Sequence, residues 1–115
     1  MTNQPPTTTA PGGSVIELTA GGFDRQVRDG LTVVDFWAPW CPPCRAMATQ
    51  LERAAKLRPQ YRFAKVNVDE HLALAARFGV RSIPTLAVIR DGKLLGQASG
   101  LVGAEELATA LDRAA

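Results

Sequence analysis

One segment of the sequence constrains the fold more than any other: an unbroken apolar run that leads directly into a pair of cysteines. Leu31–Ala38 is almost continuously hydrophobic, which is typical of a central strand buried on both faces of a sheet. It is followed closely by Trp40-Cys41-Pro42-Pro43-Cys44-Arg45. Proline suits the first position of a helix, because its missing N–H would have no partner there. The segment therefore predicts a buried strand that turns into a helix with two cysteines at its start.

The rest of the chain alternates between strand and helix patterns, and Asp91-Gly92 is a strong signal for a hairpin. The expected strands are Val15–Leu18, Leu31–Ala38, Arg62–Val68, Thr85–Arg90 and Lys93–Ser99. The expected helices are a short one capped by Thr19 with Phe23 and Val27 on one face, then Pro42–Leu57, His71–Phe78 and Gly103–Ala114. The two longer helices should bury Cys44, Met47, Ala48, Leu51 and Ala55, and Leu107, Ala110, Leu111 and Ala114. This order predicts an α/β fold, a mixed sheet with helices on both faces.

Length and charge limit the function classes. At 115 residues the chain has room for one core, and a net charge of +2 argues against nucleic acid or an anionic membrane as partner. Residues 1–14 carry no charged side chain and are rich in Thr, Pro and Gly, so we expect a disordered tail followed by one domain over residues 15–115. Without an export signal or an apolar run long enough to span a bilayer, the expected location is the cytoplasm.

Cys41 and Cys44 are the only cysteines in the chain. Their spacing closes a very small disulfide ring, which constrains the unfolded chain too little to serve mainly as a staple. A zinc half-site would need further ligands, and His71 is the only histidine. The start of a helix favours the thiolate, the form that attacks disulfides. We therefore expect thiol–disulfide exchange, with an exposed Cys41 as nucleophile and a less accessible Cys44 as resolving thiol.

Asp35 interrupts the apolar strand six positions before Cys41. Burial raises the pKa of a carboxyl group, and alternation along the strand directs Asp35 beneath the helix that follows. It is a candidate to take the proton of Cys44 and return it, through a water molecule. Lys65, the polar residue of the neighbouring strand, is a candidate to moderate the Asp35 pKa, although a lysine whose ammonium reaches solvent explains it equally well.

Together with other segments of the chain, the cysteine motif and Asp35 make the sequence resemble the thioredoxin family. The matching segments are Val34–Arg45, Ala64–Asp69, Gly79–Thr85 and Asp91-Gly92, in thioredoxin order. The resemblance implies the thioredoxin fold, a five-stranded mixed sheet with four helices. It also implies a cis Ile83–Pro84 bond facing the cysteines, and a shallow peptide groove formed by Trp40, Ile83, Pro84, Gly100 and Leu101.

The family also implies an activity and partners. The chain should reduce protein disulfides and hold no cofactor itself, and its electrons should come from NADPH through a flavin-dependent thioredoxin reductase. Its targets should include ribonucleotide reductase, methionine sulfoxide reductase and peroxiredoxins. We expect a monomer that binds neither nucleic acid nor a membrane.

Two departures from the family pattern stand out. Thioredoxins usually have Gly-Pro between the cysteines, whereas this chain has Pro42 and Pro43, which removes an N–H near Cys41 and stiffens the loop. Thr49 stands where many relatives carry a kinking proline. The altered dipeptide leaves open an oxidase or isomerase of the same fold, and a binding subunit whose redox chemistry is incidental is a further alternative.

Overall fold

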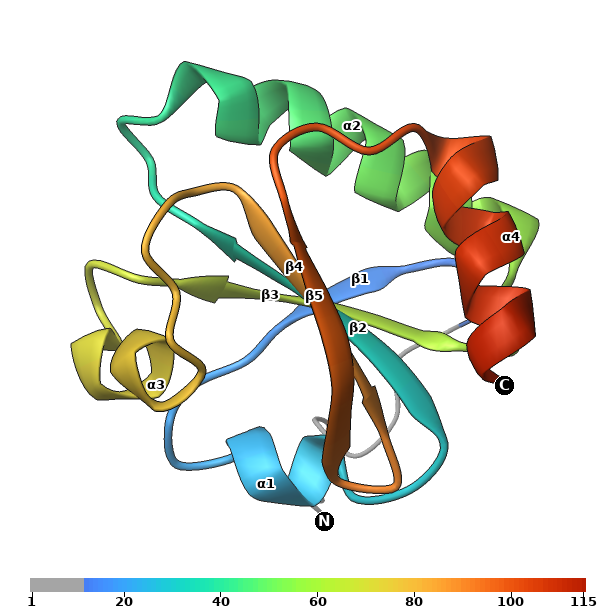
Figure 1. The fold of residues 1–115 in the computed structure, drawn as a ribbon, viewed down its shortest axis with the longest axis horizontal. Coiled ribbons are helices and arrows are strands. Elements are labelled where there is room, and N and C mark those ends of the chain that lie inside the picture. The colour runs from blue at the N-terminus through green and yellow to red at the C-terminus, as the bar shows by residue number, and fades with distance from the viewer. Residues whose placement is uncertain (1–11) are drawn as a thin grey trace, which may run out of the picture.

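The computed structural model describes residues 12–115, and the elements follow the expected order (Figure 1). The strands are β1 (Val15–Glu17), β2 (Leu31–Trp37), β3 (Arg62–Asn67), β4 (Thr85–Arg90) and β5 (Lys93–Ser99). The helices are α1 (Phe23–Gln26), α2 (Pro42–Leu57), α3 (Leu72–Arg77) and α4 (Ala104–Ala114). None of these helices is long and apolar enough to cross a membrane.

The five strands form one mixed sheet in the order β1-β3-β2-β4-β5. β1 and β2 pair parallel with β3, while β4 is antiparallel to both β2 and β5. Helices α2 and α4 cover one face of the sheet and α1 and α3 the other (Figure 1). The predicted mixed sheet with helices on both faces is confirmed.

Strand β2 lies at the centre of the sheet and separates two apolar cores. Val33 packs with α2 and α4, whereas Val34 and Phe36 pack on the face of α1 and α3. All three are fully buried, and burying a side chain of this size stabilises a fold by about 1.5–3 kcal/mol. Burial on both faces explains why the strand is almost continuously apolar. It also places Asp35, which shares the face of Val33, beneath α2.

The hairpin between β4 and β5 is formed as expected. Asp91 and Gly92 have φ of 51° and 83°, the left-handed pair that a two-residue turn of this kind requires. The Asp91 side chain also accepts the Gly30 N–H at 2.8 Å, which ties the turn to the start of β2. Beyond the turn, β4 and β5 pair antiparallel, with a register shift between Val88 and Ile89.

The N-terminal expectations are met only in part. Residues 1–11 of the expected tail lie outside the described residues. Thr19 does not cap α1, since the helix begins at Phe23 and the Thr19 carbonyl instead accepts the Gly22 N–H in a preceding turn. Phe23 and Val27 are buried, as expected.

Three alanines of the expected buried stripes are less buried than predicted, and one of them, Ala114, is half-buried at the end of α4. Ala110 is exposed, and Ala108 is buried in its place, because α4 contacts the core through Ala104, Leu107, Ala108 and Leu111. Ala48 is only half-buried, and Ala54 joins the buried face of α2. The position of Ala48 matters for the site, because this residue borders two cavities described below.

Candidate active site

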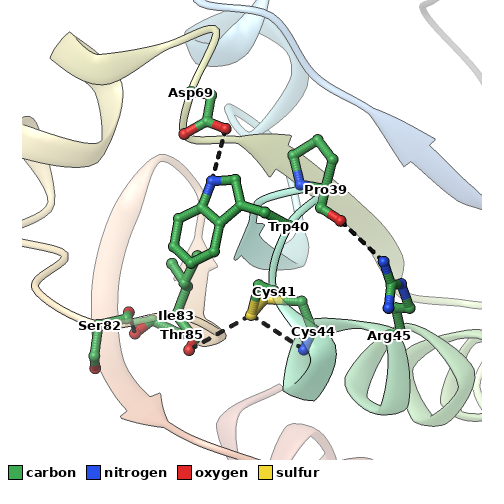
Figure 2. The surroundings of a disulfide bond; sticks show 9 residues. All are labelled: Pro39, Trp40, Cys41, Cys44, Arg45, Asp69, Ser82, Ile83 and Thr85. Carbon is green, nitrogen blue, oxygen red and sulfur yellow. Dashed lines mark hydrogen bonds between the residues drawn. A yellow bond between two sulfur atoms is a disulfide. The ribbon is translucent and has the colours of Figure 1, made fainter.

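The two cysteines lie at the junction of β2 and α2, which places them at the start of the helix (Figure 2). Cys41 is the N-cap residue, and its Sγ accepts the backbone N–H of Cys44 at 3.3 Å. Pro42 and Pro43 occupy the first helical positions and have no N–H to offer. The Cys44 amide is thus the first helical donor that a sulfur at position 41 meets, and it would stabilise a thiolate there.

The cysteines form a disulfide, with Cα atoms 5.3 Å apart. Both residues are only 3% exposed, so the prediction that Cys41 is the more exposed of the two is wrong for this oxidised form. The cause is tertiary packing, since Ala38, Trp37 and Ile83 lie against the pair. Access to the Cys41 sulfur therefore depends on the segments around it rather than on its place in the motif.

The Ile83–Pro84 bond is cis and lies beside the disulfide, as the family resemblance implied. The Ile83 carbonyl oxygen is 3.9 Å from Cys41 Sγ (Figure 2). The Pro84 carbonyl accepts the Gly100 N–H at 2.9 Å, which brings the start of the β5–α4 loop to the same place. The chain thus brings together around the sulfurs segments that are more than forty residues apart in sequence.

Two large apolar side chains stand exposed near these segments. Trp40 is 65% exposed and Leu101 is 62% exposed. The Trp40 indole N–H donates to Asp69 at 2.9 Å, which fixes the ring beside the disulfide (Figure 2). Asp69 lies outside the cysteine motif, and its position in the sequence near His71 does not predict this contact. Its signal was its place just after β3, because the carboxyl ends of parallel strands β2 and β3 meet at one edge of the sheet.

Asp35 is buried beneath α2, as predicted, with 2% of its surface exposed. Its Oδ1 has no hydrogen-bond partner among residues 12–115. Desolvation raises the pKa of Asp35 from the ordinary 3.8 to about 7, and the positive charge of Lys65 opposes this rise. A carboxyl group with this pKa exchanges its proton readily near neutral pH.

Lys65 is the direct neighbour of Asp35 across the β2–β3 pairing. Its Nζ lies 5.0 Å from the centre of the Trp37 ring, a cation–π contact. Trp37, the last residue of β2, is half-buried and lines the smaller cavity of the site. The ammonium lies close enough for its positive charge to lower the pKa of Asp35, against the effect of burial.

Two cavities meet at Asp35. The smaller, of about 120 Å³, also reaches Cys44, Trp37 and Arg45. The larger, of about 360 Å³, lies between α2 and the segment Gly13–Val15. Asp35, Lys65 and Ala48 border both cavities, which explains why Ala48 is not fully buried. Each volume is large enough for water molecules, and the carboxyl group supplies a polar partner.

If the cysteine pair were half of a zinc site, further ligands would have to lie near it, and the described part of the chain supplies none. Within residues 12–115 no group of three or more His, Cys, Asp or Glu side chains could hold a metal ion. His71 is the N-cap residue of α3 and makes no side-chain capping bond. The arrangement around the cysteines is that of a nearly buried disulfide beside a buried acid.

Comparison with known proteins identifies the family. Residues 14–113 match the thioredoxin family model. The chain belongs to the thioredoxin family. Thioredoxins of several Staphylococcus aureus strains are each 40% identical to it over 101 residues, which cover 87% of this chain and 97% of the relative.

The fold comparison agrees. A mutant thioredoxin from Halobacterium salinarum superposes with a TM-score of 0.82 at 29% identity, covering 91% of this chain and 94% of that one. The expected thioredoxin fold is confirmed. As in other thioredoxins, the close Cys41–Cys44 pair makes this chain a protein-disulfide oxidoreductase of the reductase type.

Proposed function

We propose that this chain reduces disulfides of target proteins with Cys41 as the nucleophile and Cys44 as the resolving thiol. The observation that carries the proposal is the position of Cys41 at the N-cap of α2, where its sulfur accepts the Cys44 amide. Helix starts and amide donors favour the thiolate. Cys44, one turn inside the helix, is placed to attack the Cys41 sulfur from behind.

The exchange proceeds in two steps that balance. The Cys41 thiolate attacks one sulfur of the target disulfide, forming a mixed disulfide and releasing the other target sulfur as a thiolate, which takes up a proton. Cys44 then loses its proton and attacks Cys41 Sγ. The second target sulfur leaves as a thiolate, and the two electrons of the dithiol have passed to the target.

Asp35 is the proposed acceptor of the Cys44 proton. The 120 Å³ cavity borders both side chains, so a water molecule can bridge them. A general base works best when its pKa lies near the working pH, and burial raises the pKa of Asp35 to about 7. Lys65 is proposed to keep that pKa from rising further, since its charge acts in the opposite direction.

The substrate is proposed to lie in a shallow groove over the disulfide. Trp40 and Leu101 would supply apolar contact, and the backbone at Ile83, before Pro84, would pair with an extended peptide. The exposure of both large side chains supports this reading. Gly100 belongs to the same surface because its N–H is bound to Pro84.

The proposed electron source is NADPH, through a flavin-dependent thioredoxin reductase, with no cofactor bound to this chain. The proposed targets include ribonucleotide reductase, methionine sulfoxide reductase and peroxiredoxins. The proposed setting is the cytoplasm, where thiols are kept reduced, and the proposed active form is a monomer. Family membership supports a reductase and disulfide-bearing targets in general.

A trapping experiment tests the assignment. Cys44→Ser, supplied in its reduced form, should accumulate a mixed disulfide with a disulfide-bearing target such as insulin, whereas Cys41→Ser should form none. Both variants should fail to turn over. Equal trapping by the two variants would reject the roles assigned to the cysteines. Tight target binding that survives replacement of both cysteines would favour a binding subunit instead.

A further inference from the structure

The loop between β5 and α4 carries one wall of the proposed groove, and three hydrogen bonds hold it. The Gly100 N–H donates to the Pro84 carbonyl at 2.9 Å. The Val102 N–H donates to Met47 Sδ at 3.4 Å, and the Ala104 N–H donates to Gln50 Oε1 at 2.9 Å. The exposed Leu101 lies between the first two of these anchors.

Two of the three acceptors are side chains of α2. The first amides of a helix have no partner within the helix, and Gly103, the N-cap of α4, has no side chain that could serve. Gln50 therefore caps α4 from the neighbouring helix. Met47 is fully buried, so its sulfur is a fixed acceptor.

The Gln50 side chain is itself held in place. Its Oε1 also accepts a hydrogen bond from Arg53 Nη1 at 2.9 Å, and Arg53 pairs with Glu105 in the first turn of α4. This network locks the amide oxygen toward the Ala104 N–H. Met47 and Gln50 follow Cys44 by one and two helical turns, so the helix that carries the resolving thiol also fixes the opposite wall of the groove.

We propose that Gln50, assisted by Met47, is a positioning residue that sets the place of Leu101 and so determines affinity for extended polypeptide substrates. This inference rests on the proposed function. Neither side chain is among the residues packed around the sulfurs, so the exchange chemistry does not depend on them directly. An extended segment with an apolar side chain beside its disulfide needs the wall, whereas a small disulfide does not.

The test compares two substrates and three variants. Gln50→Leu removes the acceptor at similar size, Gln50→Glu keeps an oxygen acceptor, and Gln60→Leu makes the same change at an exposed position beyond α2. The saturating rate (kcat) and the half-saturating concentration (KM) are measured with insulin and with a small aromatic disulfide, by mixing excess substrate with protein that has been reduced and then freed of dithiothreitol.

Gln50→Leu should raise KM for insulin by roughly three- to tenfold, the effect of one lost hydrogen bond, with kcat and the small-disulfide rate unchanged. Gln50→Glu and Gln60→Leu should match the parent protein. If Gln50→Leu does not fold, Met47→Leu, which removes the sulfur acceptor at nearly constant volume, should raise KM for insulin in the same way.

Three results would overturn the inference: an unchanged KM for insulin, an equal loss on both substrates, or a Gln50→Glu variant as impaired as Gln50→Leu. A parent protein that reduces neither substrate would refute the proposed function, and this inference with it. A parent protein that reduces both, beside a variant with unchanged KM, would refute the positioning role alone.

Discussion

Replacing Asp35 with asparagine should make the oxidised protein more stable at neutral and alkaline pH. Asp35 is 2% exposed, and desolvation raises its pKa from 3.8 to about 7, a difference of 7 − 3.8 = 3.2 units. At about 1.4 kcal/mol per unit, charging this carboxyl group in the folded state costs about 4 kcal/mol more than charging it in the unfolded chain.

The sign of the pH dependence follows from these two values. Below pH 3.8 the carboxyl group is protonated in both the folded and the unfolded state, so its ionisation does not lower the free energy of unfolding. Between pH 3.8 and about 7 the unfolded chain releases the proton while the folded chain retains it, so the free energy of unfolding falls as the pH rises. Above pH 7 the whole cost is present.

The assay is urea unfolding of the oxidised parent protein and of Asp35→Asn at intervals from pH 4 to pH 8. The variant's advantage should grow across this range to about 4 kcal/mol, since asparagine does not titrate. Asp29→Asn, at a well-exposed carboxyl group, is the matched control and should change stability by less than about 0.5 kcal/mol. If the free energies of unfolding of the parent and of Asp35→Asn changed with pH in the same way, the reasoning would be refuted. Ionising Asp35 in the folded state would then carry no extra free-energy cost.

Three further outcomes follow from the same site. Lys65→Met should raise the pKa of Asp35 further, because the opposing positive charge is lost; infrared or NMR titration of the carboxyl group measures it, and an unchanged or lower value would contradict the electrostatic role. Ala48→Leu should fill the space beside Asp35 and slow the step in which Cys44 is deprotonated, seen as a lower turnover rate at pH 6–7; full activity would argue against a water bridge. Pro42→Gly should raise the reduction potential of the disulfide by on the order of 10–20 mV, which makes the couple less reducing. Glycine loses more backbone entropy on ring closure, and it adds an amide N–H beside Cys41. A redox titration that shows a more negative potential would contradict this.

Local patterns in the sequence predict most of the elements of this fold. The apolar run at β2 and the proline start of α2 place both elements to within one residue of the structure. The hairpin at Asp91-Gly92 is likewise local chemistry. Asp35 could be placed under α2 because alternation along a strand fixes the face on which a side chain lies.

The missed features depend on tertiary contacts. Cys41 is buried because Ile83, more than forty residues away, packs against it, and no local pattern carries that information. Ala48 fits a buried helical stripe, yet the space beneath it is a cavity rather than a side chain. The cis Ile83–Pro84 bond could be predicted only from the family resemblance, because most X–Pro bonds are trans.

The contacts of Asp69 and Gln50 could not be predicted from the cysteine motif either. Each side chain binds a partner at least 29 residues away, so its function depends on how the helices and loops come together. Placing such residues from sequence would require knowing which strand ends and which helix faces meet.

The central claim is that Cys41 and Cys44, with Pro42 and Pro43 between them, form a reducing couple. The most direct test equilibrates the protein with graded dithiothreitol or glutathione buffers and follows the tryptophan fluorescence. We expect a potential of about −270 mV, the value typical of thioredoxins. A potential in the range of about −120 to −180 mV would contradict the account and assign the protein an oxidising or isomerising role.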